Sequence, residues 1–215
     1  MHLFILIIAA LLVACTNLTV ADEKFQEAIT LLQGGTVEAV QRGRDAMELA
    51  AALGSGDAAL TLGYMHLKGQ AGYVADAGAA LTYFTKAATA GNTDAMYNTG
   101  LAYLRGNGTE VDFTEAFRWF EKAAYAGDAG AQYNTAVMLL NGEGADPDPV
   151  MAMVWFYLSD EQGYEGAKDG GKAARQKMTD EQAAGFEDVL EATKAKITMP
   201  KPTSQRSSVS ENTPL

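Results

Sequence analysis

Few side chains in this sequence are suited to metal binding or nucleophilic catalysis. It has two histidines, His2 and His66, and one cysteine, Cys15. A zinc site needs three or four such ligands, and a catalytic nucleophile needs a base that a third group orients. Tyr103 and Leu139 hold the positions that match His66 further along the chain, so we expect a packed histidine rather than a general base. We therefore predict no metal site, no cofactor and no enzymatic activity.

Two short motifs resemble ion-binding loops but lack the residues that such loops need. Gly106-Asn107-Gly108 resembles part of a phosphate-binding loop, yet the lysine and the preceding strand are missing. Asp146-Pro147-Asp148-Pro149 has the carboxylates of a calcium loop, but its prolines and the missing downstream glutamate argue against that function. We expect both segments to be turns.

The cysteine follows an apolar N-terminal run. Leu3–Val13 is uncharged and 11 residues long, whereas a membrane-spanning helix needs about 20. The run ends in Leu12-Val13-Ala14-Cys15, which resembles the lipobox of bacterial lipoproteins, whose cysteine is acylated. We predict a lipoprotein signal peptide over 1–14 and a lipidated Cys15 with a short tether over 15–21. An uncleaved anchor and an ordinary signal peptide are the alternatives, because Met1-His2 carries no positive charge.

The charge of the chain narrows the classes of partner. The net charge of −11 opposes binding to nucleic acid, and it opposes docking on anionic lipid through a basic patch. A basic protein surface would be attracted, although an acidic surface also simply confers solubility. We expect contact with a membrane only through the lipid anchor, a protein partner, and a monomer.

A period of 36 residues sets the architecture. Gly91, Gly127 and Gly163 keep this step, and so do Ala80, Ala116 and Ala152. Within one period, 92–104 and 113–126 have helical patterns, and a glycine-containing turn separates them. A period of this length, built from two helices, is typical of an all-α solenoid of helix-turn-helix repeats.

The second helix of each period carries an apolar stripe. In the middle period, Ala116, Trp119, Phe120, Ala123 and Ala124 fall on one helical face. Because each aromatic is in register with the alanines, we predict that these rings are the structural core of the repeats and not a ligand site. The predicted core aromatics are Tyr83, Phe84, Trp119, Phe120, Trp155 and Phe156.

The period also predicts the boundaries of the units. We expect a degenerate N-terminal repeat over 22–54 and full repeats over 55–91, 92–127 and 128–163. A C-terminal half-repeat with a capping helix follows over 164–198. Thr179-Asp180-Glu181-Gln182 is a capping box, which predicts one helix running to about Ile197 with Phe186 and Leu190 on its apolar face. The Pro- and Ser-rich segment 199–215 is predicted to be disordered.

The repeats are similar to a known family. The segments 96–108 and 132–144 resemble the first helix and turn of Sel-one-like repeats (SLR), and 116–128 resembles their second helix, A-x-x-W-[FY]-x-K-A-A-x-x-G. These repeats are relatives of tetratricopeptide repeats. Thr99, Thr135 and Ala136 depart from the family pattern and are expected to soften the core locally. The resemblance implies a mostly non-catalytic protein.

The resemblance also implies where a partner binds. In tetratricopeptide-like solenoids the first helices line a concave face, where the candidate partner-binding residues are Lys68, Asn98, Arg105, Asn134 and Asn141. The amides have an alternative role, which is to satisfy groups of their own helices. We expect an adaptor or scaffold that binds another envelope protein, located at the outer membrane and facing the periplasm, or soluble in the periplasm or secreted.

Two other functions stay open at this point. One is an immunity lipoprotein that neutralises a secreted periplasmic toxin, whose basic surface would suit the acidic chain. The other, more remote, is an enzyme that acts on β-lactams or peptidoglycan, as a cysteine-rich branch of the family suggests. That branch clamps its repeats with disulfides, and this chain has no second cysteine.

Overall fold

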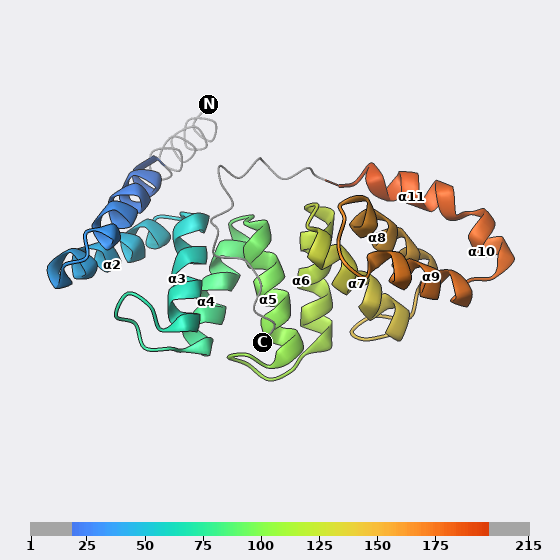
Figure 1. The fold of residues 1–215 in the computed structure, drawn as a ribbon, viewed down its shortest axis with the longest axis horizontal. Helices are drawn as coiled ribbons and strands as arrows, with labels where there is room; N and C mark the ends of the chain where they lie inside the picture. Colours follow the sequence, from blue (N-terminus) through green and yellow to red (C-terminus); the bar gives the residue numbers. More distant parts are fainter. Residues whose placement is uncertain (1–18, 198–215) are drawn as a thin grey trace, which may run out of the picture.

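The computed structural model describes residues 19–197, so the predicted signal peptide, Cys15 and the predicted disordered tail lie outside the described residues. Every regular element of the described part is an α-helix, which confirms the predicted all-α solenoid (Figure 1). After a helical segment over 19–33, the elements are α2 (Val37–Ala52), α3 (Gly56–Lys68), α4 (Ala77–Thr89), α5 (Thr93–Arg105), α6 (Phe113–Tyr125), α7 (Ala129–Asn141), α8 (Pro149–Glu161), α9 (Ala167–Lys177), α10 (Asp180–Ala184) and α11 (Phe186–Lys194).

Polar caps and glycines set the ends of the helices in each repeat. Asp112 accepts a hydrogen bond from the Glu115 backbone N–H at the start of α6, and Asp128 accepts one from Ala131 at the start of α7. The first helix of each repeat ends at a glycine with a left-handed backbone, such as Gly106 with φ of 72°. Glycine adopts this conformation without steric cost, so it ends the helix and starts the loop.

Each repeat packs as a helix hairpin around its aromatic side chains. Phe84, Trp119, Phe120, Trp155 and Phe156 are buried as predicted, whereas Tyr83 is half-buried and stacks on His66. The first helices approach closely because they present glycine to these rings. A Cβ atom on Gly100 would lie 2.8 Å from Cδ1 of Phe120, and one on Gly63 would lie 2.5 Å from Cδ1 of Phe84. Contacts of this kind join neighbouring helices into one continuous core.

The C-terminal cap differs from the single helix that the sequence predicted. The capping box of Thr179 and Gln182 is present, but the helix breaks at Gly185, which separates α10 from α11. Glycine has a low helix propensity, so a break is least costly there. The break lets α11 lie along α8, where Phe186 meets the ring of Tyr157 and Leu190 is buried. Glu187, Asp188 and Glu191 face solvent, as expected of a terminal cap.

Candidate functional site

The first helices of the repeats, α3, α5 and α7, form a face that we call the first-helix face. A small hollow of about 50 Å³ opens where α3, α4 and α5 meet. Its apolar wall comes from Leu67, Leu81, Phe84 and Leu101, and three polar side chains, Asn98, Arg105 and Asn107, also line it. A water molecule needs about 10–15 Å³ of such space, so the hollow has room for a small side-chain group.

Asn98 is held in place by two hydrogen bonds. Its Nδ2 donates to the Tyr64 hydroxyl at 2.8 Å and to the Asp94 carbonyl oxygen at 2.7 Å. The Lys68 ammonium lies 6.0 Å from the centre of the Tyr64 ring. Burial raises the pKa of Tyr64, so this hydroxyl stays neutral at physiological pH. Two predicted site residues, Lys68 and Asn98, are therefore connected through a tyrosine that the sequence analysis did not single out.

Arg105 is the charged side chain of this hollow. It is exposed at the end of α5, and no ion pair of residues 19–197 includes it. Asn107 follows it in the loop and lines the same hollow. The hollow thus combines an apolar wall with the Arg105 guanidinium and the Asn107 amide, which suit a peptide that offers an aliphatic side chain and backbone or carboxylate acceptors. Both Nδ2 hydrogens of Asn98 are donated to Tyr64 and Asp94, so its Oδ1 would serve a peptide as an acceptor.

Asn134 belongs to a separate group of side chains. It hydrogen-bonds with the Tyr97 hydroxyl, which also interacts with Tyr164. The rings of Tyr133 and Tyr164 lie 5.2 Å apart between centroids. Burial, followed by the neighbouring Tyr164, raises the pKa of Tyr97 to about 12. Asn134 therefore satisfies a tyrosine of the preceding repeat and not a group of its own helix. The bond from Asn98 to the Asp94 carbonyl oxygen lies within α5 and matches the alternative role that the sequence analysis allowed for the amides.

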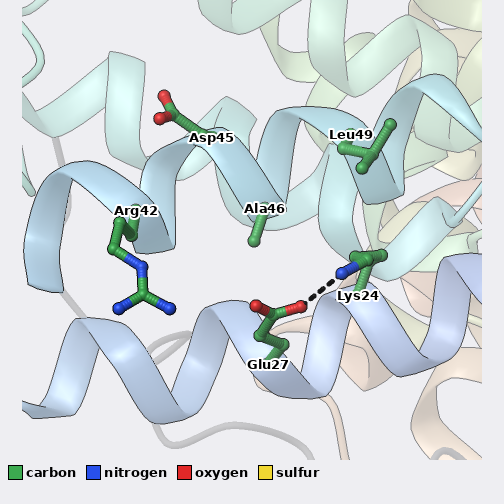
Figure 2. Close-up of a pocket in the computed structure, with 6 residues that line it drawn as sticks. All are labelled: Lys24, Glu27, Arg42, Asp45, Ala46 and Leu49. Atoms are coloured by element: carbon green, nitrogen blue, oxygen red, sulfur yellow. Dashed lines mark hydrogen bonds and ion pairs between the residues drawn. The ribbon is translucent and has the colours of Figure 1, made fainter.

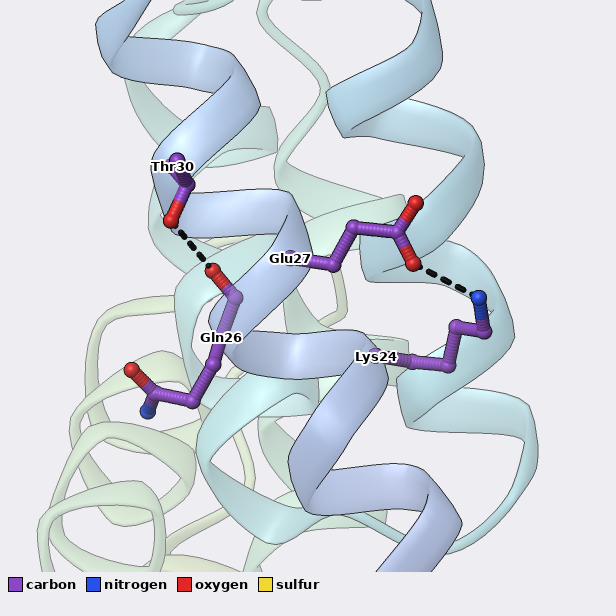
Figure 3. Close-up of polar contacts among 4 residues, drawn as sticks. All are labelled: Lys24, Gln26, Glu27 and Thr30. Atoms are coloured by element: carbon purple, nitrogen blue, oxygen red, sulfur yellow. Dashed lines mark hydrogen bonds and ion pairs between the residues drawn. The ribbon is translucent and has the colours of Figure 1, made fainter.

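A second, larger hollow lies at the N-terminal end of the array. It has a volume of about 230 Å³ and lies between the segment 19–33 and α2, as Figure 2 shows. Its charges largely compensate one another. Lys24 Nζ lies 2.6 Å from Glu27 Oε2 (Figures 2 and 3). Arg42 and Asp45 add one charge of each sign, and Asp45 accepts a hydrogen bond from Gln41. The hydrogen bond from Lys24 lowers the pKa of Glu27.

The helix beside this hollow also has a hydrogen bond that does not line the hollow. In the segment 19–33, Thr30 Oγ1 donates to the Gln26 carbonyl oxygen at 3.0 Å, a bond within the helix itself (Figure 3). Leu49 and Ala46 supply its apolar surface. We place the candidate site at the smaller hollow of α3, α4 and α5, because two of the predicted partner-binding residues, Asn98 and Arg105, line it.

Comparison with protein families identifies the repeats. The family described as Sel1 repeat matches residues 56–92, 93–128 and 129–164, which together make up half of the chain. The chain belongs to the Sel1 repeat family. Sel1 repeat proteins commonly mediate protein interactions. A search of curated proteins finds no match for this Sel1 repeat protein.

Solved structures show the same architecture. A Sel1 repeat protein from Oxalobacter formigenes is 31% identical over 59% of this chain and 94% of its own length, with a TM-score of 0.55. The protective antigen c5321 of uropathogenic Escherichia coli, described as displaying an SLR fold, is 22% identical over 82% of this chain, with a TM-score of 0.54. This Sel1 repeat protein spans 46% of the length of that antigen, and at 22% identity the likeness shows the fold alone.

The structure brings together only some of the predicted partner-binding residues. Asn98 and Arg105 line the hollow, and Lys68 lies near the Tyr64 ring, whose hydroxyl bonds with Asn98. Asn134 lies in the tyrosine group, and Asn141, although exposed at the end of α7, lines neither hollow.

The sequence analysis missed several residues of this face in the Sel1 repeat protein. They are Asn107, Leu67 and Leu101 in the hollow, and Tyr64, Tyr97, Tyr133 and Tyr164 beside it. A signal was present for two of them, because Tyr97 and Tyr133 precede Asn98 and Asn134 with the same 36-residue step. The leucines gave no signal, since apolar residues of a first helix are also expected in the core.

His66 is packed between aromatic rings. The centroids of Tyr73 and Tyr83 lie 4.3 and 5.3 Å from that of His66. Tyr73 in turn donates to Glu48 at 2.7 Å and lies under the Arg44 guanidinium. Among residues 19–197, no group of three or more His, Cys, Asp or Glu side chains could hold a metal ion. Within the same range, no helix is both long and apolar enough to cross a membrane.

Proposed function

We propose that this Sel1 repeat protein is a non-catalytic adaptor that binds another protein of the bacterial cell envelope through its first-helix face. The observation that carries the proposal is the hollow of α3, α4 and α5. Its wall is apolar, and Asn98, Asn107 and the uncompensated Arg105 line it as well. An apolar recess with a few oriented polar groups is typical of sites that take a side chain of a partner.

The cellular setting is part of the proposal. Cys15 is the proposed acylation site, and the chain would then be held at the outer membrane with its repeats facing the periplasm. Support comes from the lipobox-like sequence Leu12-Val13-Ala14-Cys15. The described helical segment already includes residue 19, four positions after the cysteine, so residues 19–21 of the predicted tether 15–21 are helical instead. The array would therefore lie close to the membrane surface.

A site-specific crosslinking experiment tests the binding face. A photo-crosslinking amino acid replaces Asn107, which lines the hollow, or Arg118, which is exposed on the second helix α6. We expect a defined crosslinked partner from position 107 in native envelopes and none from position 118. Equal crosslinking from both positions, or crosslinking from position 118 alone, would place the binding face elsewhere.

The purified partner then allows a quantitative test with matched charge reversals. Arg105→Glu removes the guanidinium of the hollow, and Arg118→Glu makes the same change on α6. A hydrogen bond to a charged group contributes about 1.5–3 kcal/mol, so Arg105→Glu should weaken the affinity about tenfold or more. Arg118→Glu should leave it within about twofold, as is typical of an exposed charge outside an interface. An unchanged affinity of Arg105→Glu would contradict the proposed site.

An inhibitory role is the second candidate, favoured by the net charge of −11. An immunity lipoprotein would bind a basic periplasmic toxin and block it. Co-expression separates the two roles, because an immunity protein rescues growth from the toxin and an adaptor binds a resident envelope protein without one. Turnover of a chromogenic β-lactam by the purified protein would instead support the remote enzymatic alternative.

A further inference from the structure

The loops that join the two helices of each repeat lie along one edge of the solenoid. They cover residues 69–76, 106–112 and 142–148, and they lie at the lower side in Figure 1. The loops 106–112 and 142–148 each rest on the start of the preceding second helix. A Cβ atom on Gly108 would lie 2.2 Å from the Ala77 carbonyl oxygen, and one on Gly144 would lie 2.1 Å from that of Phe113. Glycine permits this contact, so consecutive loops form a continuous surface.

Apolar side chains are exposed on this surface. We define the loop edge as the loops 106–112 and 142–148 together with Phe113, the first residue of α6. Val111 is 52% exposed and Phe113 is 45% exposed, and Pro147, at the position of Val111 in the next repeat, is also exposed. On the neighbouring loop, Val74 is 84% exposed. Single exposed apolar residues are common, but a group of them on one edge indicates an interaction surface.

The charges of the loop edge are all negative. Residues 106–166 contain 11 acidic and 2 basic side chains. Both basic groups are engaged on α6, Arg118 with Glu115 and Lys122 over the Trp119 ring at 4.1 Å. On the loop edge, Glu110 and Asp146 are exposed, and neither takes part in an ion pair of residues 19–197. Their charges are therefore available to a cationic partner.

We propose that the loop edge is a second protein-binding surface and that its partner presents a basic segment in which Lys or Arg alternate with aliphatic residues. The aliphatic side chains would cover Val111 and Phe113, and the cations would meet Glu110 and Asp146. Charge complementarity selects this occupant, because an acidic or nucleic-acid partner would be repelled. The loop edge adjoins the hollow, because Asn107 belongs to both, but Glu110, Val111, Phe113 and Asp146 do not line the hollow. Variants at these four positions therefore test the proposal separately from the adaptor role proposed above.

Synthetic peptides of defined composition test this proposal on the purified full chain. The probe is an eight-residue peptide of alternating Lys and Leu, and its matched controls alternate Lys with Ser and Glu with Leu. Fluorescence anisotropy should show the Lys/Leu peptide binding most tightly, the Lys/Ser peptide at least fivefold more weakly, and the Glu/Leu peptide not at all. Equal affinity for the Lys/Leu and Lys/Ser peptides would show that Val111 and Phe113 do not contribute to binding, and it would overturn the proposal.

Charge-reversal pairs then locate the surface. Glu110→Lys with Asp146→Lys should weaken binding of the Lys/Leu peptide at least tenfold. The control pair is Asp160→Lys with Glu165→Lys, two exposed acids at the opposite ends of the helices that change the net charge equally. This control should change the affinity less than threefold. Similar losses in both pairs would mean that the peptide only senses net charge, and the proposal would be overturned.

Substitution of the exposed apolar residues tests whether they contribute to peptide binding. Val111→Ser with Phe113→Ser should weaken the Lys/Leu peptide at least fivefold and leave the Lys/Ser peptide unchanged, with the circular dichroism spectrum as the check on folding. The charge-reversal pairs keep both apolar residues, so the proposal can be tested even if the serine variant folds poorly. Concentration-dependent dimerisation that the serine variant abolishes would assign the loop edge to a second copy of this chain and overturn the proposal.

Discussion

The threonine at the centre of α7 offers a sharp test of the packing argument. Thr135 is fully buried, and its hydroxyl oxygen has no hydrogen-bond partner. Burying an unpaired hydroxyl costs about 1–3 kcal/mol in proteins. Valine has nearly the same shape and a similar helix propensity, so Thr135→Val should raise the free energy of unfolding by about 1–2 kcal/mol. For an array of this size, that corresponds to an increase in Tm of about 2–8 °C.

The matched control is the equivalent residue of the preceding repeat. Thr99 is also fully buried, but its hydroxyl donates to the Ala95 carbonyl oxygen at 2.8 Å. Thr99→Val removes a satisfied hydrogen bond and should lower the free energy of unfolding by about 0.5–1.5 kcal/mol. Urea unfolding followed by circular dichroism measures both variants, and the m-value should stay constant because the surface exposed on unfolding is unchanged.

The two variants should therefore move the urea midpoint in opposite directions. A destabilised Thr135→Val protein would show that the Thr135 hydroxyl has a partner and would refute the reasoning. Two variants shifted in the same direction by the same amount would show that helix propensity, not hydrogen bonding, decides the outcome.

Three further predictions concern other parts of the chain. Gly170→Ala places a Cβ atom 2.3 Å from Cε1 of Phe156 and should lower the free energy of unfolding, measured in urea, by about 1–3 kcal/mol. Gly171→Ala has its nearest contact at 3.7 Å and should raise the free energy of unfolding by up to about 1 kcal/mol. Equal effects of the two variants would contradict the packing of α9 on α8. The raised pKa of about 12 for Tyr97 and Tyr73 means that the folded state keeps these protons while the unfolded chain loses them near pH 10. The stability that their neutral forms contribute is therefore fully present below pH 10 and is lost as the pH rises to about 12. Tyr97→Phe should reduce this loss of stability when urea midpoints are compared across that pH range. An identical loss in the variant would contradict the raised pKa of Tyr97. Cys15→Ala should abolish incorporation of labelled palmitate in cells, and persistent labelling would exclude the proposed lipidation.

Much of the fold follows from local sequence signals. Asp112 and Asp128 were expected at helix starts, and Gly127 at a helix end, because these residue types satisfy or tolerate the backbone there. The buried stripe of Trp119 and Phe120 follows from helical spacing alone. The cap was harder, because a capping box reports the start of a helix and gives no information on its length. The break at Gly185 depends on what α11 can cover on α8.

The candidate site was only partly predictable. Asn98 and Arg105 were named from their positions in the repeat, and both line the hollow. Asn134 has the same position in its own repeat but hydrogen-bonds with Tyr97, which also interacts with Tyr164. Tyr164 lies 36 residues after Asp128, the N-cap residue of α7. Equivalent residues thus have different partners. Periodicity predicts the position of a side chain on a helix, but the neighbouring repeat determines its contacts.

The sequence alone determined the fold class and the repeat length of this protein, because caps, glycines and helical spacing act over a few residues and recur every 36 residues. Its acidic charge follows directly from its composition. Only the tertiary structure decided which side chains meet. The hollow of Leu67, Leu81 and Leu101 needs three helices from two repeats, and the loop edge needs glycines that let one loop rest on the preceding repeat. These surfaces bring together residues from different helices, such as Leu67 and Leu101 or Ala77 and Gly108, and no pattern within one helix encodes such contacts.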